Sequence, residues 1–254
     1  MKNLYPVKAE RFAMLACLLI FFIASCKKDD VEPPPPPSEA QLYADAVSDA
    51  MVADSTEIVD TLWAIDKQDV HLQWKTINGK EYVLMATFMK YPDSYPEGDS
   101  ITNSWGESWL FIPEQMKERL TPGFTAQSDT IQRICQLLGL PPESSTSNTH
   151  IAQVWVRSEQ LFRPAGNASI TTTTAPGDLV SGNPAGYETW FNAYIISSYY
   201  APLNPGGYHY PWTRLGYTYD WAPGSAHVGL SEYVLRANSG MWVEKTQTAA
   251  AFYQ

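Results

Sequence analysis

Residues 70–89, VHLQWKTINGKEYVLMATFM, carry the clearest structural signal in the chain. Apolar and polar residues alternate from Val70 onward, and a second apolar run follows Asn78-Gly79. Asn-Gly between two such runs is typical of a β-hairpin with a two-residue turn, in which Trp74 faces Val83. One face of this hairpin is predicted to be core, and its members are Leu72, Trp74, Val83 and Met85.

Other segments have the spacing of helices and strands. The predicted helices are residues 38–53, a short helix beginning at Pro113, residues 128–138 and residues 187–199. The further predicted strands are residues 108–112, 151–156, 228–236 and 241–245, the last two joined by a turn at 238–240. Because helices and strands alternate without the regular rhythm of a parallel sheet, we predict an α+β fold. It has a mostly antiparallel sheet with several packed helices, in a single domain over residues 38–254.

Residues 1–25 have the features of a secretory leader. Basic residues precede an apolar run at 12–23, which is short for a membrane-spanning helix. The sequence Ile23-Ala24-Ser25-Cys26 resembles a bacterial lipobox. The resemblance implies cleavage before Cys26 and acylation of this cysteine with diacylglycerol and palmitate, so that a lipid bilayer holds the mature lipoprotein.

The residues after Cys26 predict where the body is displayed. Lys27-Lys28-Asp29-Asp30 resembles the short basic-then-acidic tag that sends lipoproteins of the Bacteroidota to the outer face of the outer membrane. We expect a cell-surface protein, and a protein facing the periplasm is the alternative. Prolines 33–37 favour an extended chain of about 3.1 Å per residue. Residues 26–37 are therefore expected to be a stalk.

Composition argues against several kinds of partner and site. The formal net charge of −10 makes nucleic acid an unsuitable partner. Only Cys135 follows Cys26 among the cysteines, which leaves no internal disulfide and no cysteine-based zinc site. The four histidines lack the spacing of a helical metal motif. We therefore predict neither a metal nor a cofactor.

Residues 204–224 contain the densest group of candidate functional side chains. A long irregular segment inside a compact domain is usually functional or disordered, and the aromatic content of this one argues against disorder. Aromatic rings stack on the apolar faces of sugars, and a few polar groups then fix the orientation of the ligand. The predicted binding residues are Trp212, Arg214, Tyr217, Tyr219, Asp220 and Trp221. The expected partner is a glycan or an envelope protein.

Residues 204–224 and three other segments together resemble a known protein family. Together with residues 137–142, 155–164 and 229–234, the segment resembles a family of bacterial proteins of unknown function. The resemblance extends over about residues 105–254. It implies no activity, substrate or catalytic residue.

An enzymatic alternative uses Glu232 with Arg157 or Arg163. A strand arginine, the threonine run at 171–174 and a glutamate on a late strand resemble the site of mono-ADP-ribosyltransferases. The resemblance implies that the arginine orients dinucleotide phosphates and that the glutamate stabilises an oxocarbenium-like transition state. Its catalytic residues would be Arg157 and Glu232.

A purely structural interpretation of residues 204–224 is also open. Here the aromatic side chains pack the segment onto the sheet, and Arg214 pairs with Asp220. We favour a binding protein over an enzyme. Both functional interpretations require four charged residues to meet at one pocket. These residues are Arg157, Arg214, Asp220 and Glu232.

Overall fold

The predicted hairpin forms one edge of the main sheet in a computed structural model of the chain. Strand β1 (Trp74–Ile77) pairs with β2 (Lys80–Met89), and Trp74 faces Val83, as predicted. The first strand begins later than expected. Asp69 accepts a 2.9 Å hydrogen bond from the His71 N–H and turns the chain, so that Val70 is 89% exposed.

The structure describes residues 35–125 and 127–253. The predicted leader, the lipobox with Cys26 and the export tag lie outside these residues. From Pro37 onward the chain forms one compact unit. Within the described ranges, no helix is both long and apolar enough to cross a membrane.

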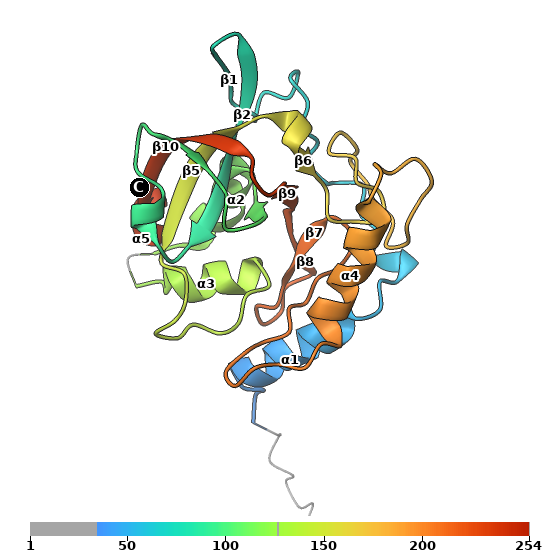
Figure 1. Cartoon of the computed structure of the whole chain (residues 1–254). Helices are drawn as coiled ribbons and strands as arrows, with labels where there is room; N and C mark the ends of the chain where they lie inside the picture. Colours follow the sequence, from blue (N-terminus) through green and yellow to red (C-terminus); the bar gives the residue numbers. More distant parts are fainter. Residues whose placement is uncertain (1–34, 126, 254) are drawn as a thin grey trace, which may run out of the picture. The chain divides into compact units, whose positions relative to one another are not determined.

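The main sheet has five antiparallel strands in the order β1-β2-β5-β10-β3 (Figure 1). Its other members are β5 (His150–Val156), β10 (Gly240–Thr248) and the short edge strand β3 (Ser100–Thr102). Successive residues of β2 and β5 point to opposite faces of the sheet, and both faces of these two strands are covered. Val83, Met85, Val154 and Val156 lie on one face. This face forms one core cluster with residues of β10 and of a second sheet.

The second sheet has three strands in the order β4-β9-β6, and a separate pair is formed by β7 and β8. The bounds are β4 (Ser108–Leu110), β6 (Leu161–Phe162), β7 (Tyr217–Asp220), β8 (His227–Ser231) and β9 (Tyr233–Leu235). The prediction of one continuous strand over residues 228–236 is wrong. The chain leaves one sheet and enters the other at Glu232, because β8 pairs with β7 whereas β9 pairs with β4 and β6.

The strands β9 and β10 also differ from the prediction. They are joined by the expected turn, but they pair with different neighbours rather than with each other. Residues 204–224 are only partly irregular, since β7 lies within them.

Within residues 35–125 and 127–253, five α-helices cover the sheets. They are α1 (Glu39–Ala50), α2 (Pro113–Leu120), α3 (Thr130–Leu137), α4 (Tyr187–Tyr199) and α5 (Ala249–Phe252). Single 3-10 turns lie at Ser55–Glu57, Pro92–Ser94, Thr121–Gly123 and Ser158–Gln160. The first four helices match the predicted segments. Ser38 caps the N-terminus of α1, and its hydroxyl accepts a hydrogen bond from the Gln41 N–H.

The helices form two groups. Helices α2, α3 and α5 pack with residues of β2 and β5 in one cluster, and α1 and α4 pack with β6, β7 and β9 in another. Figure 1 shows α1 and α4 on the side of the body away from the five-stranded sheet. The α+β class with mostly antiparallel sheet is therefore confirmed.

Candidate functional site

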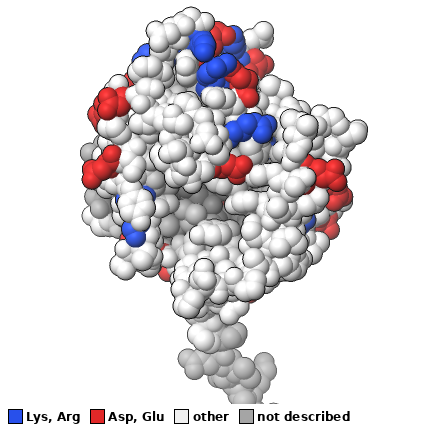
Figure 2. All heavy atoms as spheres, in the orientation of Figure 1, with Lys and Arg blue, Asp and Glu red and all other residues white. Residues whose placement is uncertain are grey.

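A cavity of about 370 Å³ lies where β2, β4, the turn after α3, and α4 meet. Residues 210–212, Thr218 and Glu232 complete its wall. Figure 2 shows that this face of the body is hollowed near its centre and that most atoms around the hollow are uncharged. The cavity thus joins segments that are far apart in the sequence.

One wall depends on the glycine that ends α3. Gly139 has a φ of 64°, in the left-handed region that favours glycine. A Cβ at this position would lie 3.2 Å from Pro211 Cγ and 3.3 Å from the Tyr219 carbonyl oxygen. Glycine therefore lets the turn pack directly against residues 210–212.

Aromatic rings form the opposite wall. The ring of Tyr194, on α4, lies 5.0 Å from Trp109 and 4.8 Å from Trp212 between centroids. The ring of Tyr194 thus packs against both tryptophans, and these contacts fix the orientation of the three rings. By contrast, the cavity-lining rings of Trp105 and Tyr210 are 52% and 44% exposed, so they are free to stack on a ligand.

Glu232 contributes the most unusual polar group of the cavity. Its backbone N–H donates to the Gly216 carbonyl at 3.0 Å, which fixes it at the break between β8 and β9. Its side chain lines the cavity together with Tyr194 and Trp212, which belong to the aromatic cluster. Among residues 35–125 and 127–253, no hydrogen-bond or ion-pair partner of its carboxylate is found.

Burial raises the pKa of Glu232 to about 8, and the charge of Arg163 lowers it in part. The side chain is half-buried by surface area because the cavity reaches it, and protein encloses its other sides. A carboxyl in such surroundings favours its neutral form. At neutral pH, Glu232 is therefore mostly protonated and can donate as well as accept a hydrogen bond.

Glu107 is the second carboxylate of the cavity. It precedes β4, and its Oε2 accepts a 2.9 Å hydrogen bond from the indole N–H of Trp190. An indole N–H can only donate, so this contact holds the carboxylate as an acceptor. No lysine or arginine belongs to the cavity lining within the part of the chain that the structure describes. The site therefore suits neutral or cationic ligands better than phosphates or carboxylates.

The predicted binding residues do not all meet here. Trp212 lines the cavity, and its indole N–H donates to the Pro164 carbonyl at 3.0 Å. The other five predicted residues make contacts elsewhere. Arg214 donates to the Met51 carbonyl, Tyr217 to the Glu57 carbonyl, Tyr219 to Asp49 and Trp221 to the Leu140 carbonyl.

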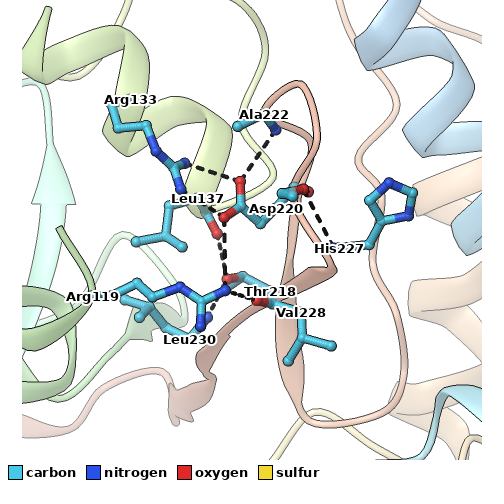
Figure 3. Close-up of polar contacts among 10 residues, drawn as sticks. Arg119, Arg133, Leu137, Thr218, Asp220, Ala222, His227, Val228 and Leu230 are labelled. Atoms are coloured by element: carbon cyan, nitrogen blue, oxygen red, sulfur yellow. Dashed lines mark hydrogen bonds and ion pairs between the residues drawn. The ribbon is translucent and has the colours of Figure 1, made fainter. Parts of the chain in front are cut away.

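Asp220 is 1% exposed and lies between two helices (Figure 3). Both of its oxygens accept hydrogen bonds from Arg133 on α3, at 2.9 and 2.7 Å. Arg119 on α2 lies 4.0 Å away and donates to the Val228 carbonyl. Asp220 thus pairs with Arg133, not with Arg214, and it ties α2 and α3 to β7.

The arginines of the enzymatic alternative lie away from the cavity. Arg157 pairs with Glu159, and neither residue lines the cavity. Arg163 is fully buried and donates to the carbonyls of Trp63, Ser169, Thr172 and Gly216. Of the four charged residues that had to converge, only Glu232 lines the cavity.

Sequence reasoning missed most of this wall. Trp105, Glu107 and Trp109 were not predicted, although the run Trp105-Gly106-Glu107-Ser108-Trp109 sets two large rings around a carboxylate. Tyr194 was predicted only as part of the helix over residues 187–199. Proximity of these residues to Glu232 depends on the tertiary fold, and no local pattern encodes it.

No protein-family model matches this chain, and neither a curated protein nor a solved structure matches it.

Proposed function

We propose that this protein is a lipid-anchored, surface-displayed binding protein that captures a glycan in the cavity beside α4. The observation that carries the proposal is the combination of exposed aromatic rings with two carboxylates, and with no basic side chain among the described residues of the lining. Sugar rings offer apolar faces for stacking and hydroxyls for hydrogen bonds. Glu232, the second oxygen of Glu107 and the hydroxyl of Tyr194 supply polar partners within one cavity.

A glycan array tests this proposal. The rings at Trp105 and Tyr210 are better targets than Trp212, because truncating a buried tryptophan costs about 3 to 5 kcal/mol of stability. Wild-type protein should be retained on at least one glycan class, and Trp105→Ala and Tyr210→Ala should lose that retention. Tyr91→Ala, a 67% exposed ring outside the cavity, is the matched control and should bind normally. A blank array for the wild type contradicts the proposal.

The anchor is a separate part of the proposal. It rests on the lipobox-like sequence at Cys26 and on the basic-then-acidic residues that follow it. Acyl chains stabilise membrane binding by about 0.8 kcal/mol per buried methylene, so a diacylated cysteine should hold the body at the bilayer. Cys26→Ser should move the protein to the soluble fraction and abolish labelling by a fatty-acid analogue. An unlabelled wild type would refute the anchor and leave the cavity proposal intact.

A further inference from the structure

We propose that the cavity is one part of a longer groove, and that the second part of this groove binds the next uncharged unit of a linear oligosaccharide. This inference rests on the proposed glycan binding and names the class of glycan. A hollow of about 260 Å³ adjoins the cavity and shares Leu140, Asn148 and Tyr210 with it. Because the two spaces share these residues, a chain-like ligand that fills the cavity has room to continue into the hollow.

Two exposed tyrosines form one side of the hollow. Tyr208 and Tyr210 both line it, and they are 48% and 44% exposed. His209 holds this segment in place, because its Nδ1 donates to the Ser198 carbonyl at 2.9 Å and its carbonyl accepts from the Tyr43 hydroxyl at 2.7 Å. The segment is thus fastened to both α4 and α1. Exposed rings on a fastened segment offer stacking surfaces that lose little freedom when a sugar binds.

Hydroxyl-bearing residues form another side of the hollow, in the turn between α3 and β5. The Ser147 hydroxyl accepts from the Ser144 N–H at 2.9 Å, and the hydroxyls of Ser144 and Thr146 lie 2.9 Å apart. These contacts fix the turn. Each hydroxyl can take part in more than one hydrogen bond, so the turn presents polar groups that suit the hydroxyls of a sugar.

Asn148 lies where the cavity and the hollow meet. Its Nδ2 donates to the Phe88 carbonyl at 2.9 Å, which fixes the orientation of the amide. No hydrogen bond to its Oδ1 is found among residues 35–125 and 127–253. An amide oxygen accepts up to two hydrogen bonds. Asn148 is therefore placed to accept from a sugar hydroxyl at the boundary between the two parts of the groove.

The lining of the hollow determines which sugars suit it. None of the described residues that line it carries a charge, and burial raises the pKa of the Cys135 thiol to about 12, so this group is neutral as well. Leu140, Pro141 and Pro142 add apolar surface, and the indole N–H of Trp221 donates to the Leu140 carbonyl at 2.8 Å. A sugar acid or a sulfated sugar would lack a basic partner here. An uncharged sugar, with an apolar ring face and hydroxyls, matches the lining.

Solution binding of oligosaccharides of increasing length tests the inference. The glycan array carries β-linked glucan, xylan, mannan and N-acetylglucosamine oligomers of one to six units, and the retained series is titrated into full-length protein by calorimetry. Affinity should rise by about tenfold or more between the shortest and the longest sugar. Tyr208→Ala should remove most of this gain and leave the affinity for the shortest sugar unchanged, because Tyr208 lines the hollow and not the cavity.

Two further variants act as controls. Tyr208→Phe keeps the stacking ring and should retain the gain with chain length. Tyr200→Ala removes a 60% exposed ring that lines neither the cavity nor the hollow, and it should bind every sugar like the wild type.

Threonine methyl groups give a second measurement, which uses the wild-type protein. Thr87 and Thr218 line the cavity, whereas Thr146 lines the hollow. With carbon-13 in the threonine methyl groups, the shortest sugar should shift signals of the cavity alone in nuclear magnetic resonance spectra. A longer sugar should shift the Thr146 signal as well. Thr146→Ser identifies this signal, because serine has no methyl group.

The outcomes separate this inference from the proposed binding function. Equal affinity at every chain length, or a Thr146 signal that the longest sugar leaves unchanged, overturns the second part of the groove and leaves glycan binding standing. A folded Tyr208→Ala that keeps the full gain also overturns it. Loss of near-ultraviolet circular dichroism in Tyr208→Ala would identify a folding defect, and the Thr146 signal of the wild type then decides. A blank array contradicts both proposals.

Discussion

Asp220 and Glu232 are two enclosed carboxylates whose surroundings differ in one respect. Asp220 receives two hydrogen bonds from Arg133 and has Arg119 nearby (Figure 3). Glu232 has an aromatic wall beside it and no cationic partner in contact within the described chain. The fold thus satisfies one carboxylate with charge and leaves the other open to a cavity.

The difference between Asp220 and Glu232 distinguishes a carboxylate that stabilises the fold from one that is available to a ligand. Asp220 joins β7 to α3 through Arg133 and lies 4.0 Å from Arg119 of α2, and it also accepts a hydrogen bond from the Ala222 N–H. An unpartnered carboxylate in an apolar site costs stability, and such costs are concentrated at functional sites. We therefore expect variants of Asp220 to change folding and variants of Glu232 to change pH dependence and ligand chemistry.

The largest expected effect is at Asp220. Asp220→Asn removes a buried charge and leaves Arg133 without its counter-ion, which should lower the free energy of unfolding by about 3 to 4 kcal/mol. Urea unfolding at neutral pH measures this loss. A loss below 1 kcal/mol would mean that water reaches Arg133 and replaces the carboxylate, and Asp220 would no longer be a structural tie.

The next effect is the pH dependence of stability at Glu232. Its folded pKa of about 8 lies above the ordinary value of 4.5, so the folded state binds the proton more tightly than the unfolded state. The stabilisation is complete below about pH 4.5 and is lost as pH rises through 8. Relative to wild type, Glu232→Gln should therefore gain on the order of 2 to 3 kcal/mol between pH 5 and pH 7.

Urea unfolding of both proteins across this range measures the effect. Arg163 opposes the shift, whereas Glu107 and Tyr194 share the cavity and are present in both proteins. The contribution of groups that titrate in both proteins therefore cancels when the unfolding free energy of wild type is subtracted from that of Glu232→Gln. Parallel stability curves would show that Glu232 is ionised throughout and would remove the contrast with Asp220.

A smaller effect is expected for ligand affinity at the mouth of the cavity. Trp105→Ala should weaken binding of the retained glycan by about 1 to 2 kcal/mol, or roughly five- to thirtyfold, because a stacking surface is lost. Its unfolding free energy should change little, since half of the ring is exposed. Titration calorimetry measures the affinity. Unchanged binding would place the ligand deeper, against Trp109 and Tyr194.

The smallest effect is expected at Arg157. Its pair with Glu159 lies near the surface, where ion pairs contribute about 0 to 1 kcal/mol. Arg157→Gln should therefore change the free energy of unfolding by less than about 1 kcal/mol and leave glycan retention unchanged. Loss of an enzymatic activity in this variant would instead favour the transferase alternative, in which Arg157 orients a dinucleotide.

The sequence predicts those features that local rules control. The turn at Asn78-Gly79 fixes the pairing of Trp74 with Val83, and the apolar spacing at 187–199 gives the bounds of α4. The break at Glu232 was not predicted, because it is defined by the different pairing partners of β8 and β9, which are distant in the sequence.

The candidate site was predictable only in part. Trp212 and Glu232 were singled out for their chemistry, but as members of different and competing sites. Trp212 and Glu232 line one cavity with Glu107 and Tyr194 because of the way β4, β9 and α4 pack. Asp220 has the same functional appearance in the sequence, yet its partner Arg133 comes from a helix that was predicted for packing alone.

The protonation state of Glu232 is the most direct test of this account. Carbon-13 labelling of the glutamate side-chain carboxyls allows each pKa to be followed by nuclear magnetic resonance from pH 3 to pH 10. One glutamate should titrate near pH 8, and its signal should be absent from Glu232→Gln. Titration of every glutamate near the ordinary value of 4.5 would contradict the proposal that the cavity holds a protonated, ligand-facing carboxyl.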